Sequence, residues 1–172
     1  AAPFDYTYYN ANTDWQDQIF RTGFITNTNI SISGSTEKAK FYLGAGYLME
    51  EGSIKSEKMN KVTINLSSDY TAKEWLRFGF QANGAYTLPA DAKNVTSAVH
   101  AAPISPVYDR TTDSYYALPD FQRAQVANPM IDIKQVARHN KAQNYRLTGN
   151  IYGEADLMES LTFRATLSVD YA

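Results

Sequence analysis

Histidine is the first residue type to examine for chemistry, because its imidazole ring serves as acid, base and metal ligand near neutral pH. The sequence contains His100 and His139 and no cysteine. Both histidines lie in one long connection without the spacing of a metal-ligand motif, and no serine stands in a G-x-S-x-G motif. We therefore predict no catalytic residue, no metal site and no cofactor, and we expect that the protein is not an enzyme.

Aromatic side chains in the same connection are the next candidates, because their rings can contact a ligand or a partner protein. They are Tyr108, Tyr115, Tyr116 and Phe121. These rings could stack on sugar rings, or they could pack the connection against its surroundings. The residue types leave both roles open.

Composition narrows the class of protein. A chain of 172 residues is long enough for one ordinary domain, and its formal net charge of −2 gives no electrostatic basis for binding nucleic acid. No apolar run reaches the length of a membrane helix. The opening AAPFDYTYY lacks the regions of a signal peptide, so we expect that any leader lies outside this chain. The 13 Tyr, 8 Phe and 2 Trp residues favour β-structure.

Residues 1–26 are predicted to form a lead-in segment with one short helix. Thr13 can cap this helix, with Gln16 three positions on as in a capping box. Trp15 and Ile19 would share one face, and Gly23 is the predicted stop.

Alternating apolar and polar residues after this segment predict an all-β fold, an antiparallel up-and-down meander. The six predicted strands are 27–35, 39–50, 60–71, 75–88, 142–156 and 161–171. Short connections alternate with longer ones, as periplasmic turns alternate with extracellular loops in outer-membrane barrels. Within the longest connection, 89–141, two sets of apolar residues recur at helical spacing: Ala92, Val95, Val99 and Ala102, then Met130, Ile133 and Val136.

The alternation also predicts the register of the strands, because a slip by one residue moves every side chain to the opposite face. The pairs expected across the three tight hairpins are Ile32 with Phe41, Tyr70 with Leu76, and Ala155 with Phe163. Each of these pairings gives the hairpin a single apolar face.

This apolar face could cover the core of a soluble domain, or it could face lipid. About eleven residues at roughly 3.3 Å each, tilted by roughly 40°, span about 28 Å, close to the apolar band of a bacterial outer membrane. Aromatic residues also group at the strand ends, as in the girdles of a lipid-facing barrel. The predicted girdles are Tyr47, Tyr86, Tyr145 and Tyr171 at the outer ends, and Phe41, Tyr70, Phe78 and Phe163 at the inner ends.

Three segments resemble the SusC/RagA family of TonB-dependent outer-membrane transporters. Asp14–Arg21 is similar to a D-W-x-D-x-I-F-R-like segment of that family. Asn29–Ser35 resembles its N-x-S-x-S-G-G-like first strand, with Ser35 where the family often has glycine. Tyr42–Gly52 resembles its Y-x-x-x-x-G-Y-hydrophobic-x-x-E-G-like second strand, and NPMIDI and the closing hairpin extend the likeness over nearly the whole chain.

The resemblance implies that residues 27–172 are a six-strand segment of a larger, 22-stranded transmembrane β-barrel, with 89–141 as a long extracellular loop. It implies a transporter of the bacterial outer membrane that imports oligosaccharides or peptides and is energised through TonB. On this basis we expect the chain to be a fragment that lacks the plug and the TonB-binding region.

The partners that the resemblance implies are outer-membrane lipid, a SusD-type surface lipoprotein, TonB, and a glycan or peptide substrate. Gly44, Gly46 and Gly79 on the polar face would mark a bulge, or would let the plug approach closely. The alternative is a soluble antiparallel β-domain that acts as an adhesin or a carbohydrate-binding module.

Overall fold

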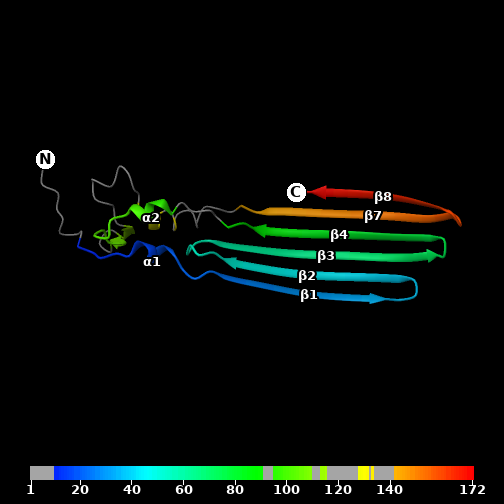
Figure 1. Ribbon diagram of the computed structural model, residues 1–172, viewed down its shortest axis with the longest axis horizontal. Coiled ribbons are helices and arrows are strands. Elements are labelled where there is room, and N and C mark those ends of the chain that lie inside the picture. The colour runs from blue at the N-terminus through cyan, green and yellow to red at the C-terminus, as the bar shows by residue number, and fades with distance from the viewer. Residues whose placement is uncertain (1–9, 91–94, 110–112, 116–127, 132, 134–141) are drawn as a thin grey trace. The chain divides into compact units, whose positions relative to one another are not determined.

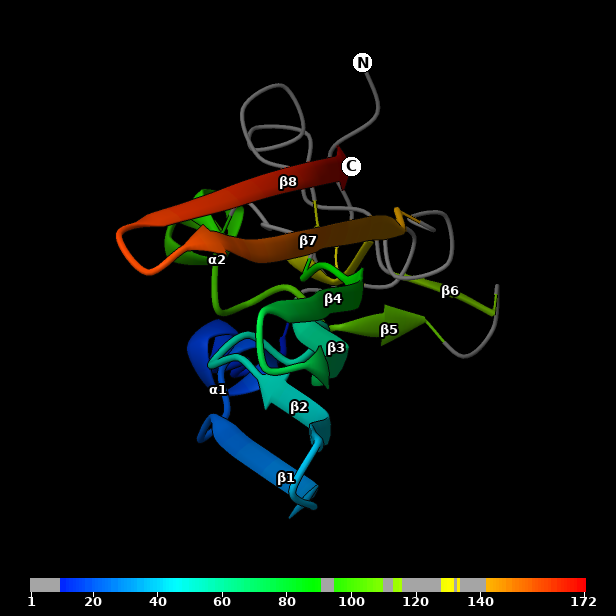
Figure 2. The ribbon, with the colours of Figure 1, turned by 90° about the vertical axis from the view of Figure 1, so that its right-hand side faces the viewer.

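A six-stranded antiparallel sheet dominates the structure, a computed structural model that describes residues 10–90, 95–109, 113–115, 128–131, 133 and 142–172. The order of strands is β1-β2-β3-β4-β7-β8 (Figure 1), and the view along the sheet in Figure 2 shows the same order. The predicted all-β meander is therefore confirmed. The strands are β1 (Phe24–Ser35), β2 (Ala39–Glu51), β3 (Lys58–Lys73), β4 (Leu76–Leu88), β7 (Asn144–Met158) and β8 (Leu161–Tyr171).

The strands begin and end within three residues of the ranges expected from the alternation. They are long: β3 has 16 residues and β7 has 15, whereas a strand in a globular protein typically has about five or six. None of the prolines falls inside the sheet, and Pro89 directly follows β4. Because proline cannot donate a ladder hydrogen bond, its position fits the end of β4.

The register of the last hairpin is the predicted one, with Ala155 opposite Phe163. The middle hairpin differs, because Tyr70 pairs with Phe78 instead of Leu76. β3 continues to Lys73, and an irregularity just before this residue changes the pairing. The displacement is two residues, which leaves the apolar face intact because side chains alternate with a period of two.

Contacts in the first hairpin indicate the same two-residue displacement. The predicted pairing of Ile32 with Phe41 would place Asn29 opposite Gly44. In the structure, Asn29 Oδ1 instead lies 2.6 Å from the position that a Cβ on Gly46 would occupy. The prediction therefore gave the correct face in both hairpins but the wrong partner.

The chain divides into two compact units, and each is described by itself. The sheet unit comprises Ile25–Glu50, Met59–Pro89 and Ala142–Ala172. The helical unit comprises Ala1–Phe24, Glu51–Lys58 and Ala90–Lys141. Its labelled elements are α1 (Trp15–Ile19), α2 (Thr96–His100), β5 (Tyr108–Asp109) and β6 (Ser114–Tyr115). Among the described residues, none of the helices is both long and apolar enough to cross a membrane.

Among the described residues, burial of apolar side chains is confined to the helical unit, since the buried residues of the sheet are the glycines Gly44 and Gly79. In the described part of the chain, the buried apolar residues are Trp15, Ile19, Ala98, Ala101, Met130 and Ile133. Trp15 and Ile19 are exposed by only 3% and 1%, so their predicted shared face is confirmed. Trp15 also donates its Nε1–H to Ala102 O at 3.0 Å, which satisfies the indole where it is buried.

The cap of α1 differs from the prediction. Asp14, not Thr13, is the N-cap, and its Oδ1 accepts the backbone N–H of Gln16 at 3.0 Å. Thr13 instead donates its hydroxyl to Ser105 O at 2.7 Å. Threonine and aspartate are both good N-cap residues. The hydrogen bond of Thr13 to Ser105 leaves Asp14 as the N-cap.

The end of α1 also differs from the predicted stop at Gly23. The helix ends at Ile19, because Phe20 takes an extended conformation and forms a β-bridge with Ile54. The bridge connects the lead-in segment to the connection between β2 and β3.

Arg21 strengthens the same link. Its guanidinium donates to Gly52 O at 3.1 Å through Nε and to Glu57 O at 3.0 Å through Nη2. Its Nη1 lies 3.1 Å from Glu51 Oε2. The segment Asp14–Arg21 therefore combines a helix cap, two core residues and an arginine that holds a neighbouring loop.

The buried face of α2 agrees with the prediction only in part: Val95, the N-cap residue, packs against the core as expected. Val99 is 66% exposed, whereas the small residues Ala98 and Ala101 are buried. Helices α1 and α2 contact each other, and small side chains permit close approach. Met130 and Ile133 are buried as expected, and the predicted members Ala92 and Val136 lie outside the described residues.

We expect Trp15→Ala to destabilise the helical unit by about 3–5 kcal/mol, the usual cost of removing a buried large aromatic side chain. Limited proteolysis of the full-length protein should then cut residues 90–141 faster than in the wild type. Val99→Ala is the matched control, because Val99 is largely exposed. Equal cleavage of the two variants would contradict the assignment of Trp15 to the core.

Candidate functional site

The apolar face of the sheet unit is exposed along the strands. Ile151 and Leu167 are 63% and 70% exposed. Other exposed residues of this face are Ile30, Ile32, Leu43, Ile64, Leu66, Phe80, Leu147 and Val169. Monomeric soluble proteins rarely expose a contiguous apolar patch of more than a few hundred Å². This face therefore requires an apolar partner or an apolar medium.

Aromatic residues occupy both ends of this face. Near the end of the sheet that carries the longer connections, called the outer end, Tyr86 pairs with Tyr145 and their ring centroids are 4.9 Å apart. Near the opposite, inner end, Tyr70 pairs with Phe78. Of the eight predicted girdle residues, Tyr86 is half-buried and the other seven are exposed. Their role as lipid-facing girdles remains a prediction.

The two aromatic groups have the same separation on β4 and β8, and Phe41 and Tyr47 on β2 are two residues closer together. The same number of residues separates Tyr86 from Phe78 on β4 as separates Tyr171 from Phe163 on β8. At about 3.4 Å per residue, this spacing is roughly 27 Å along the strand, or roughly 21 Å in height for a tilt of about 40°. Such a height is close to the apolar band of about 25 Å that outer-membrane barrels present to lipid.

The register also shows how the aromatic bands cross the sheet. Tyr145 on β7 pairs with Tyr86, but Tyr171 on β8 pairs with Leu147, which is two residues nearer the inner end than Tyr145. Phe163 is displaced by the same amount in the same direction, since it pairs with Ala155, two residues beyond the Gly153 that pairs with Phe78. Both aromatic bands are therefore displaced along the strands in the same direction from β7 to β8. Such a displacement is expected when the strands tilt relative to the bands.

The polar face carries an ionic network near its inner end. Arg77 Nη2 lies 2.7 Å from Glu154 Oε1 and 2.9 Å from Asp156 Oδ2. Thr162 donates its hydroxyl to Asp156 Oδ1 at 2.7 Å, and Arg164 Nη1 lies 3.4 Å from Glu154 Oε2. Glu154 is only 20% exposed, so its two arginine partners compensate a largely covered carboxylate. The network joins β4, β7 and β8.

Farther toward the outer end, the polar face is mainly uncharged. Two successive rows of this face contain mainly amide and hydroxyl side chains: Asn65, Asn83 and Thr148, in a row that ends with Asp170, and Ser67, Gln81, Asn150 and Ser168. Arg146 lies two residues farther out on β7, and its Nη2 is 2.9 Å from Asp170 Oδ2. This part of the face offers many hydrogen-bond donors and acceptors with little net charge.

The glycines singled out in the sequence make room for side chains of the same face. An added Cβ would meet Tyr42 at Gly44, Asn29 and Thr63 at Gly46, and Tyr152 and Asp69 at Gly79. These contacts account for the three glycines through neighbouring side chains of the sheet. The approach of a plug to them remains a prediction.

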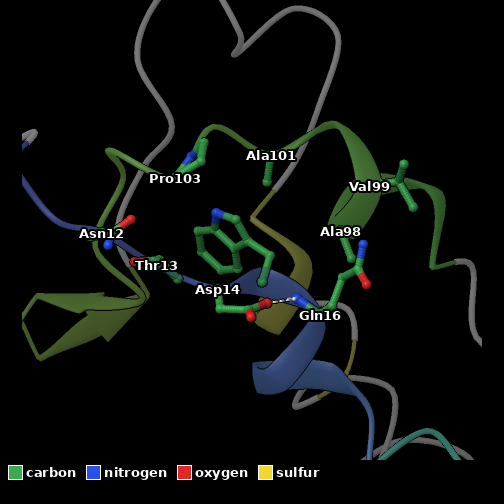
Figure 3. Close-up of a pocket in the computed structure, with 9 residues that line it drawn as sticks. Asn12, Thr13, Asp14, Gln16, Ala98, Val99, Ala101 and Pro103 are labelled. Atoms are coloured by element: carbon green, nitrogen blue, oxygen red, sulfur yellow. Dashed lines mark hydrogen bonds between the residues drawn. The ribbon is translucent and has the colours of Figure 1, made fainter.

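A separate pocket of about 560 Å³ lies in the helical unit (Figure 3). Its lining residues are Asn12, Thr13, Asp14, Trp15, Gln16, Ala98, Val99, Ala101 and Pro103. Asp14 is the one ionisable residue among them, and its Oδ1 already accepts backbone N–H groups of α1. The pocket lining supplies polar and apolar contacts but no acid–base pair.

The aromatic residues of the long connection are placed only in part. Tyr108 and Tyr115 pair in the β5–β6 hairpin, with ring centroids 5.3 Å apart in an edge-on arrangement. Tyr115 also packs against the core of the helical unit. Tyr116 and Phe121 lie outside the described residues. Packing therefore accounts for Tyr115, and ligand contact by these residues remains a prediction.

The histidines are also placed in part. His100 ends α2, and its Nδ1 lies 2.9 Å from Thr96 O. His139 lies outside the described residues. Within the ranges that the structure describes, no three His, Cys, Asp or Glu side chains converge as a metal site would require.

The network around Arg77 was not predicted from the single strands. The signal was present, because the polar face of the fourth strand carries Arg77 near its inner end and that of the fifth strand carries Glu154 and Asp156 near the same end. Finding it required pairing these two strands across the long connection, whereas the sequence arithmetic compared only the tight hairpins. Tyr152, which donates to Asp69 at 2.6 Å, was missed for the same reason.

Curated relatives match almost the whole chain. TonB-dependent receptor P3 of Formosa agariphila is 25% identical over 168 residues, which are 91% of this chain and 16% of the receptor. TonB-dependent receptor SusC of Bacteroides thetaiotaomicron is 28% identical over 170 residues, 94% of this chain and 16% of SusC. TonB-dependent receptor P39 of F. agariphila is 36% identical over 75 residues, 44% of this chain and 7% of that receptor. No protein-family model matches the chain.

A solved structure of the RagAB peptide transporter has the same fold over 94% of this chain and 19% of the transporter chain, with a TM-score of 0.70 and 20% identity. The chain thus spans about 16% of the length of relatives such as P3 and SusC. Together these matches confirm the family resemblance that the sequence motifs indicated.

We expect Glu154→Gln to weaken the ionic network of the polar face, because Arg77 and Arg164 would lose a charged partner. The urea midpoint for unfolding of the full-length protein from detergent should fall. Glu159→Gln in the inner turn between β7 and β8 is the matched control and should leave the midpoint unchanged. Equal midpoints for the two variants would show that the network adds no stability.

Proposed function

We propose that this chain forms six neighbouring strands in the barrel of an outer-membrane transporter. Its relatives confirm the resemblance to the SusC/RagA type of TonB-dependent transporter. The observation that carries the proposal is the exposed apolar face bounded by two aromatic bands. A sheet that buries so little of its own apolar surface is suited to a medium of acyl chains.

In this proposal the two faces of the sheet have different surroundings. The apolar face contacts lipid, with the aromatic bands at the two headgroup regions. The polar face, with its ionic network and its amide and hydroxyl rows, lines the lumen. The same alternation along each strand therefore serves both surfaces.

The substrate and partners of the whole protein are proposed by analogy with the relatives. We propose that it imports oligosaccharides or peptides, energised through TonB, together with a SusD-type lipoprotein on the cell surface. The support is the naming of the relatives, which are called TonB-dependent receptors, and of the structural neighbour, which is called a peptide transporter.

Fractionation of cells that produce the full-length protein tests the proposal. The protein should sediment with outer membranes and migrate as a heat-modifiable barrel, and its loss should reduce uptake of a glycan or a peptide. Recovery in the soluble fraction would overturn the proposal and would favour the alternative of an adhesin or a carbohydrate-binding module.

The environment of each face can be tested with a pair of arginine substitutions. Leu167 lies midway between Tyr171 and Phe163 on the apolar face, and Ser168 is its neighbour on the polar face. We expect Leu167→Arg to cost about 2–4 kcal/mol of folding free energy in lipid, the range for arginine at the bilayer midplane. Urea titration of the full-length protein folded into vesicles measures this cost. Ser168→Arg should cost much less, and equal costs would argue against lipid on the apolar face.

A further inference from the structure

The register between β4 and β7 needs an explanation, because no tight turn joins these two strands. A slip of two residues would leave the apolar face unbroken. Phe80 would then lie opposite Gly153 in place of Ile151, and Ala82 would lie opposite Ile151. The two-residue errors in the predicted hairpins illustrate that alternation alone does not exclude such a slip.

The charges of the polar face do not exclude it either. In the native register Arg77 pairs with Glu154. After a slip of two residues Arg77 would face Asp156, another carboxylate, so a charge pair would persist. In the opposite slip Arg77 would face Tyr152 and lose its charge pair, so charge disfavours only that slip. A feature that excludes the slip toward Asp156 must depend on shape.

Tyr152 on β7 makes a contact of this kind. Its side chain lies over Gly79 of β4, where an added Cβ would collide with the ring. Its hydroxyl donates to Asp69 Oδ1 on β3 at 2.6 Å. The guanidinium of Arg164 on β8 lies over its ring, 4.3 Å from the centroid. One side chain thus contacts three neighbouring strands.

We propose that the placement of Tyr152 over Gly79 fixes the register of β4 against β7. In either two-residue slip Tyr152 would face Gln81 or Arg77, which carry side chains where Gly79 has none. Its hydroxyl would also move by about 7 Å along the strand, beyond hydrogen-bond reach of Asp69. The native register is the one in which the ring lies over a glycine and the hydroxyl reaches Asp69.

This register has a consequence for the long connection. It determines which residues of β4 and β7 stand level with each other where the connection leaves the sheet. Tyr86 pairs with Tyr145 there, so the aromatic band at the outer end depends on the same alignment. Tyr152 is therefore a positioning residue for the strand ends that carry the long connection.

Disulfide cross-linking in the full-length protein can report the register, because this chain has no cysteine of its own. The native reporter is Asn83→Cys with Thr148→Cys, since these residues are paired. The slip reporter is Asn83→Cys with Asn150→Cys, which would pair only after a two-residue slip. Any cysteine elsewhere in the protein is replaced by serine.

We expect only the native reporter to cross-link in the wild-type background. Gly79→Ala should displace Tyr152 and raise the ratio of slipped to native cross-link about tenfold, within the range of coupling between contacting residues. Gly84→Ala is the matched control, because a Cβ there meets nothing within 4 Å. Tyr152→Phe keeps the ring and should stay mainly in the native register.

A double-mutant cycle separates this role from a general loss of stability. Tyr152→Ala should raise the slipped cross-link, and Gly79→Ala should then add much less than it does alone, because the colliding ring is gone and the Asp69 carboxylate, which the added Cβ would also meet, no longer accepts the tyrosine hydroxyl and can turn away. If Gly79→Ala alone does not fold, the proposal requires that adding Tyr152→Ala restores folding. Additive effects, no restoration, or an unchanged cross-link ratio in Gly79→Ala would each overturn the proposal.

Discussion

Lateral backbone hydrogen bonding is the interaction on which the sheet unit depends. In the part of the chain that the structure describes, apolar burial is found in the helical unit, while residues such as Leu167 and Ile151 project outward from the sheet. Side-chain packing between layers therefore does not hold these strands. Long, regular ladders do, and they allow each strand to present one chemistry on each face.

This constraint gives the two faces different roles. The apolar face stabilises the folded sheet when its side chains contact an apolar medium. It does not distinguish registers that differ by two residues, because its side chains are similar in kind. The polar face contains side chains of distinct shape and charge. Contacts that depend on shape, such as that of Tyr152 with Gly79, therefore carry the information about which residues pair.

Features that depend on periodicity could be predicted from the sequence. Alternation gave the strands, the separation of the two faces and the positions of the aromatic residues near the strand ends. It could not predict pairing partners that depend on a single irregularity in a strand. The irregularity before Lys73 is an example, because Tyr70 then pairs with Phe78 and not with Leu76, two residues away. Thr13 and Asp14 are both good caps, and the choice between them depends on Ser105, far away in the sequence. The face of α2 was predicted only in part, because close helix contact favours alanine over the larger Val99.

The segment Asp14–Arg21 shows that a sequence motif can resemble a family strongly because its residues have structural roles. Its fixed positions have structural roles: Asp14 caps α1, Trp15 and Ile19 form the core, and Arg21 holds the connection between β2 and β3. The variable positions of the motif correspond to Gln16 and Gln18, outside the buried core. A motif of this kind identifies the fold of the helical unit. Gln16 is exposed, so a change there would leave the core of the helical unit intact.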